Sequence, residues 1–306
     1  MLRFVIELLP CLVIGFWAGR HFPDRSSALA IPLVRFGVPI SVMGLLLKGG
    51  LNGEMLTAAL LAIAAITVVL VVVPRCPGLQ AMHRPTLRLG SCIGNTAYFG
   101  VPLALAFLPD QALPISIGYD LGATLLTWSI GPILLGGLGT AASGSAVRQL
   151  LSSLSSSPAS RGLLGALLVQ WSPWSSWVTT VLWWPSRLVI LLALVVLGMR
   201  LGSLWGSQSQ QHVQFSQLRP TLLVKLVLYP SLLLGLGLVL RLSPLMIQAL
   251  VLQGAAPTAI SLLLIAESVG NDQAHAAGLV FWSTVIALLS APLWGVLLTT
   301  LMTLPT

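Results

Sequence analysis

Two apolar segments in different halves of the chain are interrupted by glycine and proline, at 94–102 and at 253–261. Each lies within a stretch that has no charged residue, 89–109 and 242–266. A helix that breaks at this depth in a bilayer leaves backbone N–H and C=O groups that lipid cannot satisfy, so protein or a water-filled cavity must cover the break. Paired breaks of this kind point to a substrate site in a membrane protein.

The polar groups of these two segments suit the binding of an anion. The N-terminal end of a half-helix presents free N–H groups and about half a positive charge. A carboxylate can dock there without a buried lysine or arginine, with amide and hydroxyl groups as further donors. The alternative is a kinked but simply well-packed pair of helices, because glycine and proline are common in membrane helices. The candidate substrate-binding residues are Gly94, Asn95, Thr96, Tyr98, Gln253, Pro257, Thr258 and Ser261.

Several charged residues fall within apolar stretches, and two of them, Asp120 and Lys225, are considered for a role at the site. A charge at the centre of a membrane helix costs about 2.5–3.5 kcal/mol on insertion scales, so such residues are candidates for a functional role. We hypothesise that one of them shapes proton coupling or neutralises the site. The alternative is a structural pair, or a lysine whose ammonium group reaches the membrane surface.

The composition indicates a membrane protein. Of 306 residues, 56% are hydrophobic and only 7% are charged, whereas soluble domains carry about 25% charged residues. The basic residues behind the net charge of +8 are scattered, so no nucleic-acid partner is expected. The three cysteines, seven acids and four histidines are dispersed without metal-ligand spacing or a catalytic grouping. We therefore expect no metal, no cofactor and no enzyme activity.

Ten apolar stretches are long enough to be membrane spans, which need roughly 20 residues each. A serine-rich stretch, 139–159, is predicted to link two sets of five spans, 1–138 and 160–306. Because five is odd, the second set enters the membrane from the opposite side, so the predicted fold is all-α, with ten membrane helices in two inverted five-helix repeats. The stretches are 2–19, 28–48, 54–73, 87–108, 112–138, 160–178, 183–204, 220–241, 245–266 and 274–300.

Lysine and arginine in the loops predict the orientation, since short cytoplasmic loops are enriched in them. Nine arginines fall on one side of the predicted membrane, namely Arg20, Arg25, Arg75, Arg84, Arg88, Arg148, Arg161, Arg200 and Arg219. The other side has Arg3, Lys48, Arg187 and Arg241. This places the first set in the cytoplasm and both termini outside, in a multi-pass protein of the plasma (inner) membrane. A tryptophan-rich run, 171–184, then marks the outer rim of the bilayer.

Both interrupted segments resemble signatures of the auxin efflux carrier family, which includes the plant PIN carriers. Asn95-Thr96 followed by Gly100-Val101-Pro102-Leu103 resembles its first signature, and the run from Gln253 to Ala259 resembles its second. The resemblance covers nearly the whole chain. It departs at Gly94, where PIN carriers have proline, and at Ser261, where many bacterial members have asparagine.

The resemblance implies a secondary transporter of small organic anions such as carboxylates. It also implies broken fourth and ninth helices that cross at the substrate site, and elevator-type alternating access. Spans one, two, six and seven would form the scaffold, a homodimer through that scaffold would fit, and the others would move. The dearth of core acids favours proton coupling or uniport over sodium coupling. A channel or a non-transporting membrane sensor on the same fold is the alternative.

Overall fold

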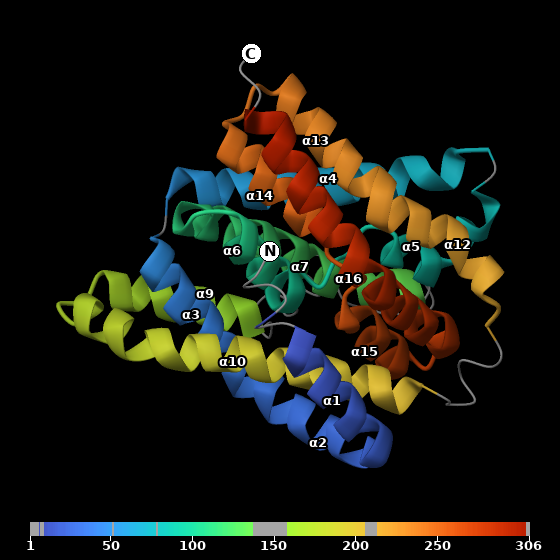
Figure 1. Ribbon diagram of the computed structural model, residues 1–306, viewed down its shortest axis with the longest axis horizontal. Coiled ribbons are helices and arrows are strands. Elements are labelled where there is room, and N and C mark those ends of the chain that lie inside the picture. Colours follow the sequence, from blue (N-terminus) through green and yellow to red (C-terminus); the bar gives the residue numbers. More distant parts are fainter. Residues whose placement is uncertain are drawn as a thin grey trace, which may run out of the picture.

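The computed structural model describes residues 6, 9–50, 52–77, 79–136, 158–205 and 213–303. Within these ranges the chain forms helices and no strand, so the prediction of an all-α protein is confirmed (Figure 1). The predicted linker, 139–159, lies outside the described residues except for its last two positions.

Four of the helices are long and apolar enough to cross a membrane: Gly53–Arg75, Ser175–Ser203, Phe215–Val239 and Gln273–Met302. Shorter apolar helices cover Thr96–Phe107, Pro244–Gly254 and Ile260–Val269. A multi-pass membrane protein is thereby supported, and the ten-span inverted repeat stays a prediction.

Most helix ends follow the proline, glycine and polar signals of the sequence. Asn52, for example, accepts a hydrogen bond from the Met55 N–H (3.0 Å) and begins the helix that follows it. The first half contains α1 Leu9–His21, α2 Pro23–Pro32, η2 Leu33–Gly37, α3 Val38–Gly49, α4 Gly53–Val72, η3 Val73–Arg75, η4 Gln80–His83, α5 Pro85–Gly90, η5 Thr96–Gly100, α6 Val101–Phe107, η6 Asp110–Ala112 and α7 Leu113–Gly136. The second half contains α9 Pro158–Gln170, α10 Ser175–Leu204, α12 Phe215–Leu223, η8 Val224–Leu228, α13 Tyr229–Val239, α14 Pro244–Gly254, α15 Ile260–Val269 and α16 Gln273–Thr303.

The turn between α9 and α10 lies at 171–174, earlier than the predicted gap between spans ending at 178 and beginning at 183. The prediction extended the sixth span to 178, whereas residues from Ser175 onward belong to the 30-residue helix α10, which contains Pro185. Proline is tolerated within membrane helices where neighbouring side chains satisfy the freed backbone groups. The Ser186 hydroxyl next to Pro185 donates to the Leu182 carbonyl at 2.6 Å.

Glycines let the backbones of α1 and α10 touch. A Cβ built on Gly19 of α1 would lie 2.0 Å from the Met199 carbonyl oxygen, and one on Gly202 of α10 would lie 2.0 Å from the Phe16 carbonyl oxygen. Gly15 and Gly198 make the same kind of approach one turn away. Such small-residue pairs four positions apart replace the missing hydrophobic driving force between helices in lipid.

The helix contacts divide the molecule into two groups. The first helix group comprises α1, α2, η2, α3, α9 and α10, and the second comprises α4 to α7 and α12 to α16. The first group gathers along the lower part of Figure 1, with α10 as its longest member. Within the second group, Gly118 and Gly122 of α7 pack against the α4 backbone, where added Cβ atoms would lie 2.1 and 2.3 Å from carbonyl oxygens.

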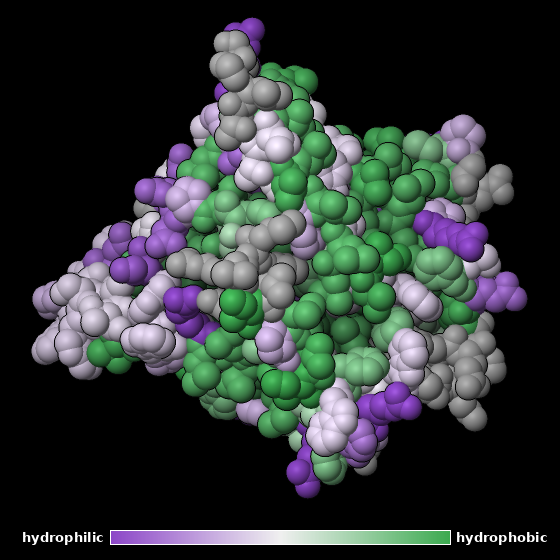
Figure 2. Space-filling view, in the orientation of Figure 1, coloured by the Kyte–Doolittle hydropathy of each residue, from purple (hydrophilic) through white to green (hydrophobic). Residues whose placement is uncertain are grey.

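Large apolar side chains cover much of the outer surface. Leu56 and Leu60 of α4, Trp184 of α10 and Leu289 and Leu293 of α16 are all exposed. Figure 2 shows apolar side chains across the middle of one face, with hydrophilic ones toward its periphery. This distribution suits a protein whose solvent is lipid.

Candidate binding site between two interrupted helices

The first interruption separates α5 from η5 and α6. The helix α5 ends at Gly90, residues 91–95 are not helical, and helical structure resumes at Thr96. The Ser91 hydroxyl donates to the Arg88 carbonyl at 2.7 Å and the Cys92 thiol to the Leu89 carbonyl at 3.3 Å. The Ser91 hydroxyl thus satisfies the Arg88 carbonyl at the end of the helix, whereas the Leu89 carbonyl also accepts from the Cys92 and Ile93 N–H groups.

The second interruption separates α14 from α15. The helix α14 ends at Gly254 and α15 begins at Ile260. Pro257 lies between them and has no N–H to continue a helix, and its ring disfavours helical geometry at Ala256. A Cβ on Gly254 would lie 2.4 Å from Leu233 Cδ1, so the chain also passes close to α13 here.

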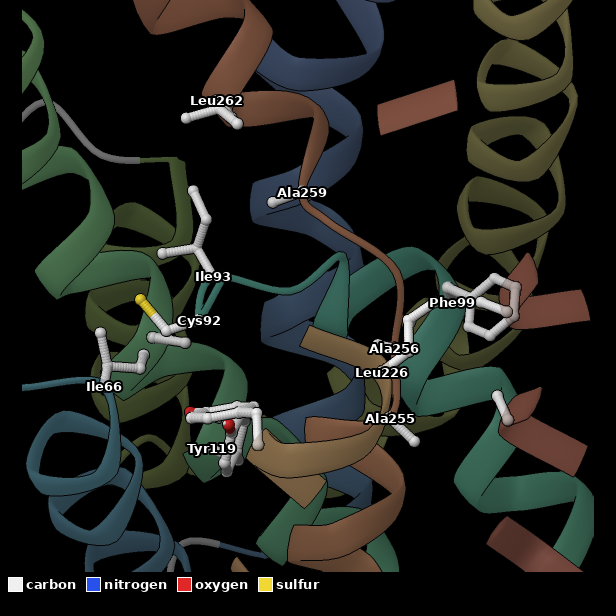
Figure 3. Close-up of a cluster of buried hydrophobic side chains, with 14 of the residues drawn as sticks. Ile66, Cys92, Ile93, Phe99, Tyr119, Leu226, Ala255, Ala256, Ala259 and Leu262 are labelled. Atoms are coloured by element: carbon white, nitrogen blue, oxygen red, sulfur yellow. Dashed lines mark hydrogen bonds between the residues drawn. The ribbon is translucent and has the colours of Figure 1, made fainter. Parts of the chain in front are cut away.

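The two nonhelical segments pair with each other in antiparallel fashion. The Asn95 N–H donates to the Pro257 carbonyl at 2.7 Å, and the Ala259 N–H donates to the Ile93 carbonyl at 3.3 Å. These bonds flank an isolated bridge between Gly94 and Thr258. Figure 3 shows Ile93 and Ala259 on these segments, among buried apolar side chains. Each break therefore satisfies part of the other's exposed backbone, as a low-dielectric setting requires.

Further bonds anchor Thr258 to the helices around it. Its N–H donates to Ser283 Oγ of α16 and its hydroxyl donates to the Gly90 carbonyl at the end of α5, both at 3.0 Å. Both the backbone N–H and the hydroxyl of Thr258 therefore donate to acceptors within the protein.

Asp120 of α7 closes the first break. The Thr96 hydroxyl donates to Asp120 Oδ1 at 2.5 Å, and the Ala97 N–H also donates to this carboxylate. These two donors belong to the first residues of η5, where unpaired N–H groups give the helix end a partial positive charge. Asp120 therefore supplies the anion at the N-terminal end of η5 from within the protein.

Lys225 of η8 caps a helix end at the second break with a positive charge. Its Nζ donates to the Gly254 carbonyl at 2.6 Å, at the C-terminal end of α14, where the helix dipole is negative. The side chain is completely buried, and Nζ lies 5.0 Å from the centre of the Tyr229 ring. A Cβ on Gly94 would lie 3.4 Å from Nζ, so the ammonium group lies beside both breaks. Asp120 and Lys225 thus serve separate helix ends rather than forming an ion pair with each other.

A cavity of about 140 Å³ lies beside the paired segments, between α10 of the first helix group and α7, η5 and α15 of the second. Most of its wall is apolar, with polar side chains at the two breaks, on α7 and on α10. Its lining residues are Leu33, Val38, Gly94, Asn95, Thr96, Ala97, Tyr98, Asp120, Thr124, Trp128, Pro158, Ala193, Val196, Arg200, Ala259, Ile260, Ser261 and Leu264.

Unpaired donors gather on this cavity. Five buried side-chain polar atoms of the described residues have no hydrogen-bond partner, and three of them belong to residues that line it: Asn95 Nδ2, Tyr98 OH and Arg200 Nε. Buried polar groups in proteins are nearly always paired, so a cluster of unpaired ones indicates a place where a ligand or water binds. Amide, phenol and guanidinium N–H or O–H groups can all donate, so an acceptor-rich ligand suits them.

The structure brings only some of the predicted site residues to the cavity. Those that line it are Gly94, Asn95, Thr96, Tyr98, Ser261 and the predicted coupling residue Asp120. Gln253, Pro257, Thr258 and Lys225 do not. In the amide orientation that satisfies both neighbours, Gln253 donates to the Thr96 carbonyl (3.2 Å) and accepts from the Val101 N–H (3.3 Å).

Arg200 is the charged residue of the cavity lining that the sequence did not mark as a site residue. It lies near the end of α10, where its charge predicted only the orientation of a loop. The signal that could have found it is its isolation, because no other lysine or arginine occurs between Arg187 and Arg219. The described residues contain no group of three or more histidine, cysteine or acidic side chains that could hold a metal ion.

An all-helical protein with apolar spans and paired breaks beside a cavity has the architecture of a membrane transporter. Residues 185–295 match the model of a family described as membrane transport proteins. A protein of Methanothermobacter thermautotrophicus described as an uncharacterized transporter is 25% identical over 223 residues, which is 72% of this chain and 70% of that protein. These similarities support a membrane transporter and confirm the resemblance to auxin efflux carriers that the two signatures predicted.

Proposed function

We propose that the chain is a secondary transporter of small organic anions and that its substrate binds in the cavity beside the paired breaks. The observation that carries this proposal is that three residues lining this cavity, Asn95, Tyr98 and Arg200, have buried donors without a partner. An anion has the acceptors that these donors lack, and it supplies the charge that favours the N-terminal end of a helix.

Within the cavity, the N-terminal end of α15 is the best place for the anionic group. The corresponding end of η5 already holds the Asp120 carboxylate. In contrast, α15 begins without a side-chain cap, and its first residues, Ile260 and Ser261, line the cavity. The Asn95 amide lies on the same wall and adds a donor. The largely apolar remainder favours carboxylates with an apolar body.

The position of the cavity between the two helix groups suits alternating access. We propose that the second helix group carries the substrate past the first, which is the elevator-type movement that the family resemblance implies. Close backbone contact between α1 and α10 supports a rigid first group. Proton coupling through Asp120 or uniport, an inner-membrane location with both termini outside, and a homodimer through the first group belong to the same proposal.

The test is current or uptake by the purified protein in liposomes, with benzoate, indole-3-acetate and malate as probes and benzamide as a neutral control. We expect a saturable signal that Asn95→Ala abolishes. Gln248→Ala is the matched control, because Gln248 lies on α14 and outside the cavity. Uptake unchanged by Asn95→Ala would place the site elsewhere.

The alternative functions are a channel and a membrane sensor. Counterflow separates them from a carrier: an anion trapped inside the liposomes accelerates uptake only when the same site faces each side in turn. Flux that rises linearly with concentration favours a channel. Ligand-dependent thermal stabilisation without any flux favours a sensor.

A further inference from the structure

Arg200 connects the two helix groups at the edge of the cavity. It belongs to α10 of the first group, and its Nη1 lies 4.0 Å from Glu267 Oε1 on α15 of the second. The arginine side chain is 16% exposed, whereas that of Glu267 is 41% exposed. The arginine is therefore the partner that depends on protein or ligand for its hydrogen bonds, while the glutamate retains water.

The ion pair with Glu267 leaves some of the N–H donors of Arg200 without a hydrogen-bond partner. Its N···O distance of 4.0 Å exceeds that of a hydrogen bond, and Nε is buried without a partner. A guanidinium group carries five N–H donors in a fixed fork that matches the two oxygens of a carboxylate. The geometry thus leaves a cation at the cavity with capacity for a second, better-placed carboxylate.

The helix α15 presents one carboxylate to Arg200, that of Glu267, on the face that also borders the cavity. Ile260, Leu264 and Glu267 follow the i, i+4, i+7 spacing, and the first two line the cavity. The seven residue steps from Ile260 to Glu267 span about 10 Å along the helix. Glu267 lies toward one end of this face, and the uncapped N-terminal end, where an anion would dock, lies at the other.

The charges around the cavity indicate a role for Arg200. Asp120 already places a carboxylate on the cavity wall, so a bound anion would be the second negative group there. Arg200 is the only basic residue among those that line the cavity. Without it, like-charge repulsion in a site of low dielectric constant opposes anion binding.

We propose that Arg200 binds the anionic group of the substrate and releases Glu267 when it does so. This inference rests on the proposed function, which it deepens by naming the cation that selects anions. In the empty protein the Arg200–Glu267 contact ties α10 to α15. In the bound protein the anionic group of the substrate pairs with the Arg200 guanidinium, and the Arg200–Glu267 contact between the two helix groups is lost. Substrate binding thereby frees the second group to move.

The experiment measures KM and Vmax for uptake of benzoate, indole-3-acetate and malate in wild type, Arg200→Gln, Arg200→Lys, Glu267→Gln and the Arg200→Gln/Glu267→Gln double variant. We expect Arg200→Gln to raise KM about 10-fold or more, since it removes a charge-assisted hydrogen bond. Arg200→Lys should recover part of the loss. Glu267→Gln should lower KM, because it removes the competing carboxylate, and the double variant should match Arg200→Gln.

The matched control is Arg219→Gln, which removes an exposed arginine that lies over the Phe215 ring and outside the cavity. Its KM should equal that of wild type. Fluorescence size-exclusion profiles identify variants that fail to fold. If the Arg200 variants fail, Glu267→Gln still tests the proposal, because KM should fall in this variant only if the substrate and Glu267 compete for Arg200.

Three results would decide against this role. An unchanged KM in Arg200→Gln overturns it while leaving anion transport intact. A KM raised equally by Glu267→Gln and Arg200→Gln identifies the pair as a structural link and overturns the exchange. If wild type neither transports nor is stabilised by any of the three carboxylates, the proposed function itself fails.

Discussion

The two interrupted helices differ in how their ends are completed. At the first break, the N-terminal end of η5 is closed by the Asp120 carboxylate. At the second, Lys225 closes the C-terminal end of α14, and the N-terminal end of α15 is left uncapped against a cavity. Two sequence segments that look equivalent therefore have different capacities. The first has the N-terminal end of its helix capped by a carboxylate, and the second leaves that end open to the cavity.

The largest expected effect comes from placing a carboxylate at the N-terminal end of α15, as Asp120 does at the N-terminal end of η5. Ser261→Asp places a carboxylate in the first turn of α15, where it takes the free N–H groups and repels an anion. We expect carboxylate uptake to fall about 100-fold or more, equivalent to roughly 2.7 kcal/mol of lost binding. Ser261→Asn is the neutral control of the same shape and should keep most of the activity. Equal uptake by the two variants would show that this helix end does not bind the substrate.

Removing the negative charge at the first break should have a smaller effect on uptake, and in the opposite direction. Asp120→Asn keeps an acceptor for the Thr96 hydroxyl but removes the negative charge that opposes a bound anion. We expect KM for carboxylates to fall several-fold, about 1 kcal/mol. If Asp120 takes up the coupled proton, wild-type uptake should decline as pH rises and the variant should lose that dependence. A pH profile unaltered in Asp120→Asn would remove Asp120 from coupling.

Lys225→Met should separate structure from binding. It leaves the buried Gly254 carbonyl without its partner, at a cost of about 1–3 kcal/mol. Because Lys225 does not line the cavity, we expect a lower unfolding temperature with KM within about threefold of wild type, a difference under 1 kcal/mol. Thermal unfolding in detergent and uptake kinetics test the two halves of this prediction. A large rise in KM at unchanged stability would instead place Lys225 in the site.

The smallest effect should come from Tyr98→Phe, which removes one neutral donor from the cavity. We expect KM to rise two- to fivefold, since a neutral hydrogen bond contributes about 0.5–1.5 kcal/mol. Ser290→Ala is the matched control, because its hydroxyl is also buried and unpaired but does not line the cavity. Identical kinetics for wild type and Tyr98→Phe would remove the phenol from substrate binding.

The sequence was informative wherever a local signal determined the structure. Gly254 and Pro257 located the second break, and the apolar run 54–73 matched α4 closely. The first break lies at 91–95, at the start of the predicted interval, and Gly100 and Pro102 fall within helical structure. The polar residues Asn95 and Ser261 were expected near a ligand, and both line the cavity. These features depend on backbone properties that a residue has regardless of its distant neighbours.

Other features depended on contacts between distant segments and could not be read from spacing. Gln253 lies within a predicted site motif, yet its amide bonds the backbone around η5 rather than facing the cavity. Asp120 meets Thr96 across 24 positions. Arg200 reaches the cavity only because α10 packs beside the breaks, which no periodicity in its own helix could indicate.

The buried lysine also has a consequence for how the protein is made. The apolar helix Phe215–Val239 must enter the membrane with Lys225 near its middle, where an unpaired lysine costs about 2.5–3.5 kcal/mol. The carbonyl that accepts its hydrogen bond belongs to Gly254, which the ribosome adds 29 residues later. The helix therefore reaches its final depth most cheaply once α14 has been synthesised, so these two segments should leave the translocon together as a hairpin.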